Sequence, residues 1–442
     1  MKLLSRVDTS VDGDLASGQL PIKVCMHVLE RVRNDGRVLR EASALIQEGF
    51  AVSIVDIESE RSCPVEEDIH GIHVKHIIMP SWFNYSWRFN PWFLVTAACM
   101  FFRCVLRLIR TPADIYHVHD AKALPACYIA AWLRRTPLIF DAHELPLAEK
   151  TIRWRGLSRV SRYLLAGMVP HCAGVITVSP PIAYEICKRY HYPKVSLIRN
   201  IPAYKSVPRN DRLRRHLGLG PETRIALYQG HIQPDRQLDR LVRAAAFLER
   251  NMVIVLMGKD IGSTSAELEA LASREGVADR LKILPPVPYE ELLEWTASAD
   301  IGLIVYSPDQ SLNVKMCLPN KLFEYLMAGL PVIATSLDAV ADTLRTYSVG
   351  RIVPSLKPAD VGAAISEMLA DHDALASMRR NALEAVQHDL NWEKEGQQLI
   401  RFYQDILAML SKAQYRHEPL SNSVSMHAIE GEHDEHSLRS EQ

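Results

Sequence analysis

The stretch PNKLFEYLMAGLPVIAT, residues 319–335, predicts a helix that leads directly into a buried strand. Pro319 is favourable in the first turn of a helix, where its missing N–H is not needed, and Gly329 is favourable at the helix end, where a left-handed residue is common. Pro331 stops the helix before the apolar run at 331–334. A helix followed at once by a continuous apolar strand is typical of a parallel sheet covered by helices.

The same alternation extends to both sides of this stretch. We expect strands at 224–229, 253–257, 281–284, 301–305, 331–334 and 350–353, with helices at 236–249, 264–274, 289–298 and 319–328. An earlier array has strands at 22–28, 51–56, 72–78, 114–118, 137–141, 174–178 and 194–198, with helices such as 37–48 and 122–134. Residues 199–212 between the arrays hold two prolines, several charges and no periodic face, as in a linker. The pattern predicts an α/β fold with two Rossmann-like, doubly wound parallel sheets in tandem.

We therefore expect five segments along the chain. They are a flexible N-terminal segment (1–21), a first Rossmann-like domain (22–205), a second one (206–390), a C-terminal helix (391–412) and a polar tail (413–442). In the last helix, Trp392, Leu399 and Phe402 recur at helical spacing, which predicts one packed face. The tail is polar and acidic with four histidines, a composition that favours disorder over a metal site.

Composition excludes several classes of protein. The 442 residues carry 51 Lys and Arg against 52 Asp and Glu, a net charge of −1, which disfavours nucleic-acid binding driven by bulk charge. Eight cysteines form no C-x-x-C pair, so we expect neither a zinc site nor disulfides, and a reducing compartment. No secretory signal opens the chain, and its longest apolar run, 92–102, is too short to span a bilayer. We expect a cytoplasmic protein, either soluble or associated with the inner face of the membrane.

Two segments of the second array carry groups suited to a nucleotide. The helix that begins at 319–321 follows a strand, so its free N–H groups, with Asn320 in its first turn and the charge of Lys321, favour a phosphate. Glu324, one turn further on, is placed to accept hydrogen bonds from a diol such as ribose. In LYQGHIQPDRQLDRL (227–241), Gly230 permits close backbone approach and Arg236 is suited to a diphosphate. Ordinary helix capping, and a solvated face of arginines, remain the alternatives.

The first array places histidines and carboxylates after two neighbouring buried strands. These strands end in YHVHD (116–120) and FDAHE (140–144), and we expect the side chains to gather on one rim of a cleft: His117, His119, Asp120, Asp141, His143 and Glu144. Zinc is one interpretation, but the spacings match no paired-ligand motif. Hydrogen bonds to sugar hydroxyls, or proton handling, fit the residue types better. A structural role for any one of them remains open.

The order of YHVHD, FDAHE, GVITVSPP, LIRNIP, LYQG, ASADIGLIVY and PNKLFEYLMAGLPVIAT resembles that of the retaining GT-B glycosyltransferases of family 4. The resemblance covers nearly all of 22–412. It implies two Rossmann-like domains facing across a cleft, a sugar nucleotide on the second domain, and a last helix that crosses back to the first. It further implies transfer of a sugar from a nucleoside diphosphate to a glycan or polyprenyl-linked glycolipid, with retention, without a metal, and in cell-surface polysaccharide synthesis.

The resemblance also implies roles for single residues. Arg236 and Lys321 match the basic pair on the donor diphosphate, and Glu324 matches the second glutamate of the E-x7-E motif, which holds the ribose. His119 matches the histidine near the transferred sugar. Gly36, in the loop at 33–38 after the first strand, matches a loop that approaches the donor. Asp120, His143 and Glu144 are then expected on the acceptor rim, and no metal ligand is expected.

Two positions depart from the family pattern. The first glutamate of E-x7-E is replaced by Met316, and the residue after the loop arginine, often glycine in the family, is Gln237. Both departures affect the choice of donor sugar and raise the alternative of an inactive relative. Two D-x-D matches, Asp12–Asp14 and Asp371–Asp373, lie outside either predicted cleft, and we do not expect them to bind metal.

Residues 81–110 predict contact with a membrane surface. Aromatic side chains are concentrated in 12 residues of this segment: Trp82, Phe83, Tyr85, Trp87, Phe89, Trp92 and Phe93. Arg103, Arg107 and Arg110 then recur along one side of a predicted helix, and aromatics with a basic stripe fit an anionic bilayer. The alternative is a core helix preceded by an aromatic loop that covers the acceptor cleft.

Two other functions remain open beside glycosyl transfer. The same fold also supports a sugar-nucleotide epimerase or hydrolase, for which the rim residues at 119–144 would supply acid and base groups. A non-catalytic subunit that binds sugar nucleotides in a polysaccharide assembly complex is the third, and Met316 and Gln237 are the residues that favour it. Free sugar, sugar joined to an acceptor, or no product would distinguish the three.

Overall fold

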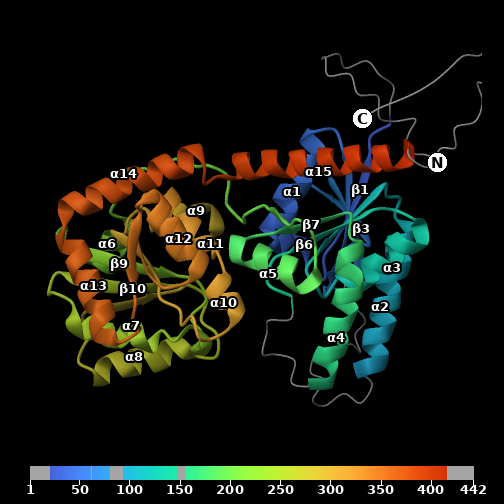
Figure 1. The fold of residues 1–442 in the computed structure, drawn as a ribbon. Helices are drawn as coiled ribbons and strands as arrows, with labels where there is room; N and C mark the ends of the chain where they lie inside the picture. Colours follow the sequence, from blue (N-terminus) through green and yellow to red (C-terminus); the bar gives the residue numbers. More distant parts are fainter. Residues whose placement is uncertain (1–19, 61, 80–92, 147–154, 416–442) are drawn as a thin grey trace, which may run out of the picture.

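The computed structural model of the chain describes residues 20–60, 62–79, 93–146 and 155–415 (Figure 1). It contains two sheets, each flanked by helices, that lie side by side and are joined at residues 198–211, where no helix or strand occurs. We call the parts built on these sheets the N-terminal and C-terminal domains. The predicted α/β class with two Rossmann-like domains is confirmed, whereas the exact domain boundaries stay predictions.

The sheet of the N-terminal domain has eight strands in the order β3-β4-β2-β1-β5-β6-β7-β8. The strands are β1 (Lys23–His27), β2 (Ala51–Glu58), β3 (Glu66–Ile69), β4 (Ile72–Ile78), β5 (Ile115–His119), β6 (Leu138–Ala142), β7 (Gly174–Thr177) and β8 (Ser196–Leu197). All neighbours are parallel except β3, which pairs antiparallel with β4. The flanking helices are α1 (Gly36–Gln47), α2 (Phe93–Arg110), α3 (Leu124–Arg134), α4 (Arg155–Met168) and α5 (Pro180–Tyr190). The sequence pattern missed β3, whose EEDI has low strand propensity and forms an edge through the turn at His70 and Gly71, both at positive φ.

The C-terminal domain has six parallel strands in the doubly wound order β11-β10-β9-β12-β13-β14. They are β9 (Arg224–Gln229), β10 (Met252–Met257), β11 (Leu281–Leu284), β12 (Ile301–Ile304), β13 (Val332–Thr335) and β14 (Gly350–Val353). The helices between them are α6 (Arg212–Leu217), α7 (Asp239–Ala244), α8 (Thr264–Arg274), α9 (Tyr289–Thr296), α10 (Leu312–Met316), α11 (Asn320–Met327), α12 (Asp338–Tyr347), α13 (Pro358–Ala370) and α14 (His372–His388). The predicted strands of this domain are all confirmed to within one residue at either end.

The predicted helix at 236–249 is wrong in its extent. The structure has a 3-10 turn at Pro234–Arg236, then α7, then a second 3-10 turn at Ala245–Phe247. Gln237 separates the first turn from α7 because its backbone is left-handed, with φ 53°. Glycine adopts this conformation at no steric cost, so the family's frequent glycine at this position has a backbone reason, and glutamine here is strained.

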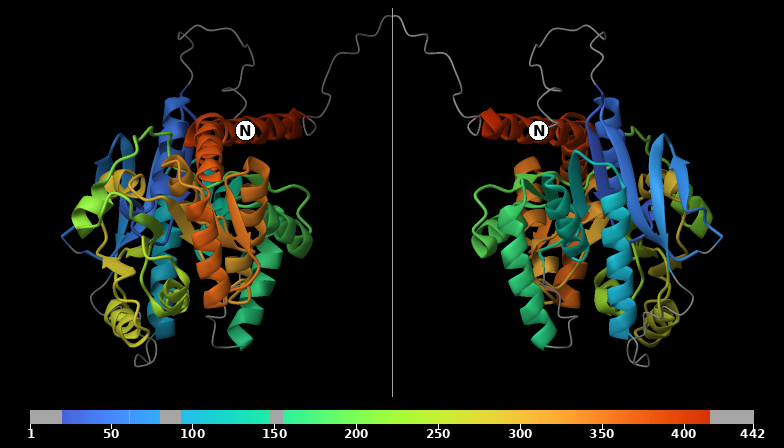
Figure 2. Two further views of the ribbon diagram at one scale, coloured as in Figure 1. Left: turned by 90° about the vertical axis from the view of Figure 1, so that its left-hand side faces the viewer. Right: turned by 90° about the vertical axis from the view of Figure 1, so that its right-hand side faces the viewer.

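The last helix, α15 (Trp392–Tyr415), crosses back and covers one face of the N-terminal sheet, as predicted (Figures 1 and 2). Leu399 and Tyr403 are fully buried against β1, β5 and α1. The contact is so close that a Cβ on Gly174 of β7 would lie 2.4 Å from the Phe402 ring. The helix therefore belongs to the core of the first domain although it follows the second in sequence. No helix in the described part of the chain is both long and apolar enough to cross a membrane.

Candidate active site

A cavity of about 670 Å³ lies between the two domains, at the carboxyl ends of their central strands. Seven of the ten predicted site residues line it: His143, Glu144, Gly230, Arg236, Asn320, Lys321 and Glu324. The other three, Gly36, His119 and Asp120, do not line it. Most of the lining comes from the C-terminal domain, and the N-terminal domain contributes His143, Glu144, Val178 and Ile182.

Lys321 lies in the first turn of α11 and is 8% exposed. Its ammonium nitrogen is 3.9 Å from the centre of the Tyr228 ring and 5.2 Å from that of Tyr306. No carboxylate of the described residues pairs with it. Aromatic faces attract a cation without cancelling its charge, so this ammonium remains available to an anion in the cavity.

Arg236 lies near the same tyrosine ring, Tyr306, as Lys321. Its guanidinium carbon is 5.2 Å from the Tyr306 ring centre, and within the part of the chain that the structure describes it forms no ion pair. Arg243, on the next helix, instead pairs with Asp239 at 2.9 Å and with Glu275 at 3.3 Å. The interpretation as a solvated, paired face therefore fits Arg243 and does not fit Arg236. Two uncompensated cations on one tyrosine form a region suited to a diphosphate.

Two glycines allow the backbone to approach this region closely. Gly230 has φ 130°, and a Cβ there would lie 2.9 Å from the Lys321 ammonium nitrogen. A Cβ on Gly258, at the end of β10, would lie 1.8 Å from the Gly230 carbonyl oxygen. Neither position accepts a larger side chain without moving the backbone or Lys321. Gly230 was predicted from the sequence; Gly258 was missed, because only the pairing of β9 with β10 brings it here.

Glu324 is held in a fixed orientation one turn along α11. The Gln229 side-chain amide donates to its carboxylate, and the Thr296 hydroxyl donates to the Gln229 amide oxygen at 2.8 Å. Burial raises the pKa of Glu324, while the hydrogen bond from Gln229 opposes that rise. Glu324 lines the cavity, and its other carboxylate oxygen can accept hydrogen bonds from hydroxyl groups.

Under the N-terminal rim, Asp141 is the centre of a buried ionic network. Arg37 donates two hydrogen bonds to it, Nε to Oδ2 at 2.8 Å and Nη2 to Oδ1 at 3.0 Å. His119 Nδ1 lies 3.2 Å and His143 Nε2 3.0 Å from Asp141 Oδ2. Burial alone would raise the pKa of Asp141, but Arg37 and His143 hold it well below its usual range. His117, His119 and Asp141 are therefore fully buried beneath the rim rather than on it, which corrects the expected rim.

His143 is the member of this network that reaches the cavity. Its Nε2 faces Asp141 and its Nδ1 lies 3.7 Å from Asp120, so both nitrogens meet carboxylates. Burial opposes a charge on this ring, but Asp141 and Asp120 raise the pKa of His143 to about 9. At neutral pH the cavity wall of the N-terminal domain therefore carries an imidazolium.

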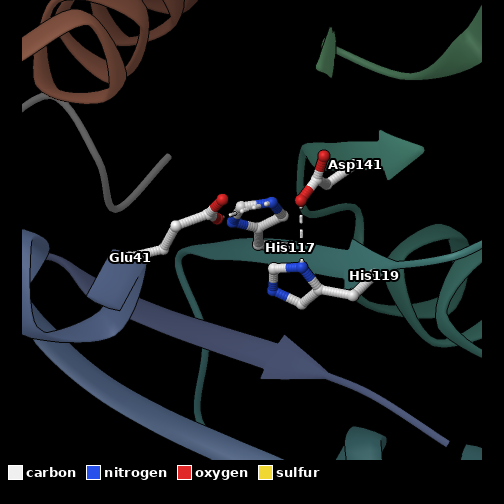
Figure 3. A group of neighbouring side chains, drawn as sticks. All are labelled: Glu41, His117, His119 and Asp141. Carbon is white, nitrogen blue, oxygen red and sulfur yellow. Dashed lines mark hydrogen bonds and ion pairs between the residues drawn. The ribbon is translucent and has the colours of Figure 1, made fainter. Parts of the chain in front are cut away.

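Glu41, His117, His119 and Asp141 each offer a ligand atom within 4.8 Å of the others (Figure 3). Arg37 already occupies the position between the two carboxylates, with its Nε 3.0 Å from Glu41 and 2.8 Å from Asp141. A divalent cation there would meet a guanidinium that has no solvent to move into. The donor set fits a buried ion-pair network better than a metal centre.

Met316, at the family's first glutamate position, packs against the apolar core of the N-terminal domain. It ends α10, whose Asn313 donates to Glu144 at 2.9 Å and accepts from the Leu145 N–H at 2.8 Å. The Ser179 hydroxyl donates to the Met316 carbonyl at 2.7 Å. The α10 segment therefore joins the two domains beside the cavity, and this explains an apolar side chain at 316.

The remaining sequence predictions concern residues that do not line the cavity. Asp371 caps α14, accepting from the Ala374 N–H at 2.9 Å, which gives the second D-x-D a structural role. Asp12–Asp14, the aromatic side chains of 82–93 and residues 416–442 of the predicted tail lie outside the described residues and side chains, and residues 413–415, expected in the tail, belong to α15. Sequence analysis missed Arg37, Tyr228, Tyr306 and Asn313. Arg37 lies in the loop at 33–38, Tyr228 within a predicted strand and Tyr306 directly after one, whereas no sequence signal marks Asn313.

Comparison with known proteins agrees with this geometry. Residues 37–201 match the model of Glycosyltransferase Family 4, and residues 209–385 match Glycosyl transferases group 1. D-inositol 3-phosphate glycosyltransferases of Thermobispora bispora and Thermomonospora curvata are 24% and 25% identical over 84% and 83% of this chain and 89% of each relative. Sucrose-phosphate synthase from Thermosynechococcus elongatus has the same fold, with TM-score 0.71, 17% identity, and coverage of 88% of this chain and 100% of that one. The Anabaena protein HepE with UDP-glucose does too, with TM-score 0.65, 17% identity and the same coverage. The two matches follow one another along the chain, and together they identify it as a glycosyltransferase with a Glycosyltransferase Family 4 domain, a Glycosyl transferases group 1 domain and the GT-B fold.

Proposed function

We propose that the protein transfers a sugar from a nucleoside diphosphate sugar to a hydroxyl of an acceptor, with retention of anomeric configuration and without a metal. One observation supports this most: Arg236 and Lys321 face the same cavity without any carboxylate partner among the described residues. Half-buried and buried cations without a counter-ion are costly unless an anion is bound. A diphosphate leaving group supplies that anion.

The chemistry follows from charge placement. As the bond from the anomeric carbon to the diphosphate breaks, negative charge grows on the phosphate oxygens, and Arg236, Lys321 and the N–H groups of the α11 N-terminus stabilise it. Retention follows when the acceptor hydroxyl attacks from the leaving-group side and passes its proton to the departing phosphate. No enzyme base is required for this step. Glu324 holds the ribose hydroxyls, and the buried His119 acts through His143 rather than by touching the sugar.

Two acceptor classes are open to test. The family resemblance and the aromatic and basic residues of 81–110 favour a glycan or polyprenyl-linked glycolipid acceptor, used in cell-surface polysaccharide synthesis at the cytoplasmic face of the membrane. The curated relatives are named for inositol 3-phosphate, which favours a small phosphorylated polyol.

The test uses the purified full chain with UDP-, GDP- and ADP-sugars, each offered inositol 3-phosphate or a polyprenyl diphosphate-linked sugar, with and without EDTA. We expect one donor to give a glycosylated acceptor of unchanged anomeric configuration by NMR, at the same rate in EDTA. The variant Arg236→Met should lose this transfer, and the matched control Arg240→Met, from the same segment but outside the cavity, should keep it. Free sugar as the only product would support the hydrolase or epimerase instead, and donor binding without turnover would support the non-catalytic subunit.

A further inference from the structure

Three neighbouring helices of the N-terminal domain expose an unusual number of apolar side chains. Of nineteen large apolar side chains exposed on the described residues, nine lie on α2, α3 and α4: Val95, Phe102, Leu106, Ile129, Trp132, Leu133, Val160, Tyr163 and Leu164. The helices pack beside one another, and Figure 1 places them together at the side remote from the C-terminal domain. Figure 2, in its right-hand view, shows α2 and α4 in the foreground on that side.

The exposed stripe of α2 is apolar where a surface helix is normally polar. Val95, Phe102 and Leu106 recur along one side of α2 and end at the exposed Arg110. A contiguous exposed apolar surface on a soluble domain marks an interaction site. Trp132, 70% exposed on α3, is a residue type enriched at membrane–water interfaces.

The three helices carry charge of one sign, although Arg107 of α2 pairs with Glu66 of β3 at 2.8 Å. The sequences of α2, α3 and α4 contain seven arginines and neither Asp nor Glu. This contrasts with the net charge of −1 for the whole chain and with α9 of the C-terminal domain, which carries three glutamates. Arg110, Arg134 and Arg162 form no ion pair within the described part of the chain. Their charges are therefore available to an external anion.

The same surface contains a recess. A cavity of about 530 Å³ lies at the end of α3, and its lining includes Tyr128, Trp132, Arg135 and His171. An aromatic wall beside a guanidinium suits a phosphate-bearing headgroup with an apolar stem.

We infer that α2, α3 and α4 form a docking surface for an anionic phospholipid bilayer. The apolar side chains enter the interfacial region, and the arginines lie at the level of the lipid phosphates. This extends the sequence prediction for 81–110 to two helices that it did not include. The inference goes beyond the proposed function, and lipid binding is measured without donor or acceptor, so either can fail alone.

The experiment is co-sedimentation of the full chain with vesicles of phosphatidylglycerol and phosphatidylcholine, or of phosphatidylcholine alone. We expect binding to the anionic vesicles that weakens as salt is raised, because salt screens exposed charges. Each arginine near such a surface strengthens binding about fivefold. The double variant Arg110→Glu/Arg162→Glu should thus bind about 30-fold more weakly or worse, and Phe102→Ser/Trp132→Ser at least ~10-fold more weakly.

The matched control is Phe247→Ser/Arg274→Glu, an exposed pair on the C-terminal domain, which should bind like the unmodified protein. Circular dichroism and thermal melting establish that every variant is folded. Absence of binding to anionic vesicles, or equal binding by both surface variants and the control, would overturn the inference. Dimerisation that only the surface variants abolish, without vesicle binding, would assign the surface to a second copy of the chain instead.

Discussion

The two walls of the cavity handle charge in opposite ways. On the C-terminal wall, Arg236 and Lys321 lie against tyrosine faces and have no acidic partner among the described residues. Beneath the N-terminal wall, carboxylates pair with both cations: Glu41 and Asp141 with Arg37, and Asp141 and Asp120 with His143. A wall with unpaired charge is built to bind a charged ligand, whereas a wall with paired charge is built to hold its side chains in place. We therefore propose that Arg236 and Lys321 contact the substrate and that the network around Asp141 supports the fold.

The largest expected effect breaks the paired wall. Asp141→Asn removes the carboxylate that accepts two hydrogen bonds from the buried Arg37 guanidinium and leaves Glu41 as its remaining charge partner, and removing one member of a buried pair costs about 3–5 kcal/mol. Urea unfolding followed by circular dichroism measures this loss. Asp120→Asn, at the half-exposed end of the same network, is the control and should cost less than ~1 kcal/mol. Equal losses for the two variants would mean that the buried pair does not support the fold.

The next effect concerns the unpaired wall. Lys321→Met removes a group that stabilises the leaving diphosphate, so kcat/KM should fall about 10²–10³-fold. Stability should be unchanged or should rise, because no ion pair is lost and an uncompensated buried charge disappears. Steady-state kinetics and urea unfolding on the same preparation test both statements. A loss of stability comparable to that of Asp141→Asn would contradict the contrast between the walls.

A pH titration sharpens the comparison. The pKa of His143 is about 9 in the folded protein against 6.5 for a free histidine, so the folded state holds its proton more tightly. This stabilisation is complete below pH 6.5 and is lost as the pH rises through 9, and at about 1.4 kcal/mol per pKa unit it amounts to roughly 3 kcal/mol at most. We expect the free energy of unfolding to fall from pH 6.5 to 9 in the unmodified protein and to fall less in His143→Gln. Parallel curves for the two proteins would show that His143 is not the titrating group.

The smallest expected effect lies beside the unpaired wall. Gln237→Gly relieves a left-handed backbone at φ 53° and should stabilise the protein by up to about 1 kcal/mol. Because Arg236 directly precedes Gln237, a change in the backbone of this loop also moves Arg236. We expect this to change the KM for the donor more than kcat. Thermal unfolding and donor titration measure the two changes. Gln233→Gly, at an extended residue of the same loop, is the control and should not stabilise.

Much of the fold was predictable because most helices and strands are specified by residues that are close together in the sequence. Apolar runs such as β9 and β10 are fully buried strands, and the helix at 320–327 has the proline and glycine expected at its ends. The errors arose where local preference was overridden. An acidic EEDI became an edge strand because the next turn folds it onto β4, and the helix after β9 broke at Gln237 because the loop requires a left-handed residue.

The candidate site was predictable to a similar extent. Residues that follow strands, such as Gly230, and those at the start of α11, such as Lys321, line the cavity as sequence position suggests. The surroundings of the histidine side chains were harder to predict, because the alternation of side chains along a strand does not show which buried residue an imidazole ring contacts. Whether these residues have their expected catalytic roles stays a prediction for the variants above.

The sequence by itself determined the two arrays of strands and helices. It also determined that Arg236 and Lys321 lie in segments that follow strands of the second array. Both depend on patterns within a few neighbouring residues. Only the tertiary structure decided that His143 rather than His119 reaches the cavity, that Arg37 meets Asp141, and that Met316 joins the domains. Arg37 and Asp141 are 104 residues apart, and their contact exists because only β5 separates β1, which α1 follows, from β6, which carries Asp141. Charge compensation is set by such distant pairings, and in this protein it distinguishes the wall that binds from the wall that supports.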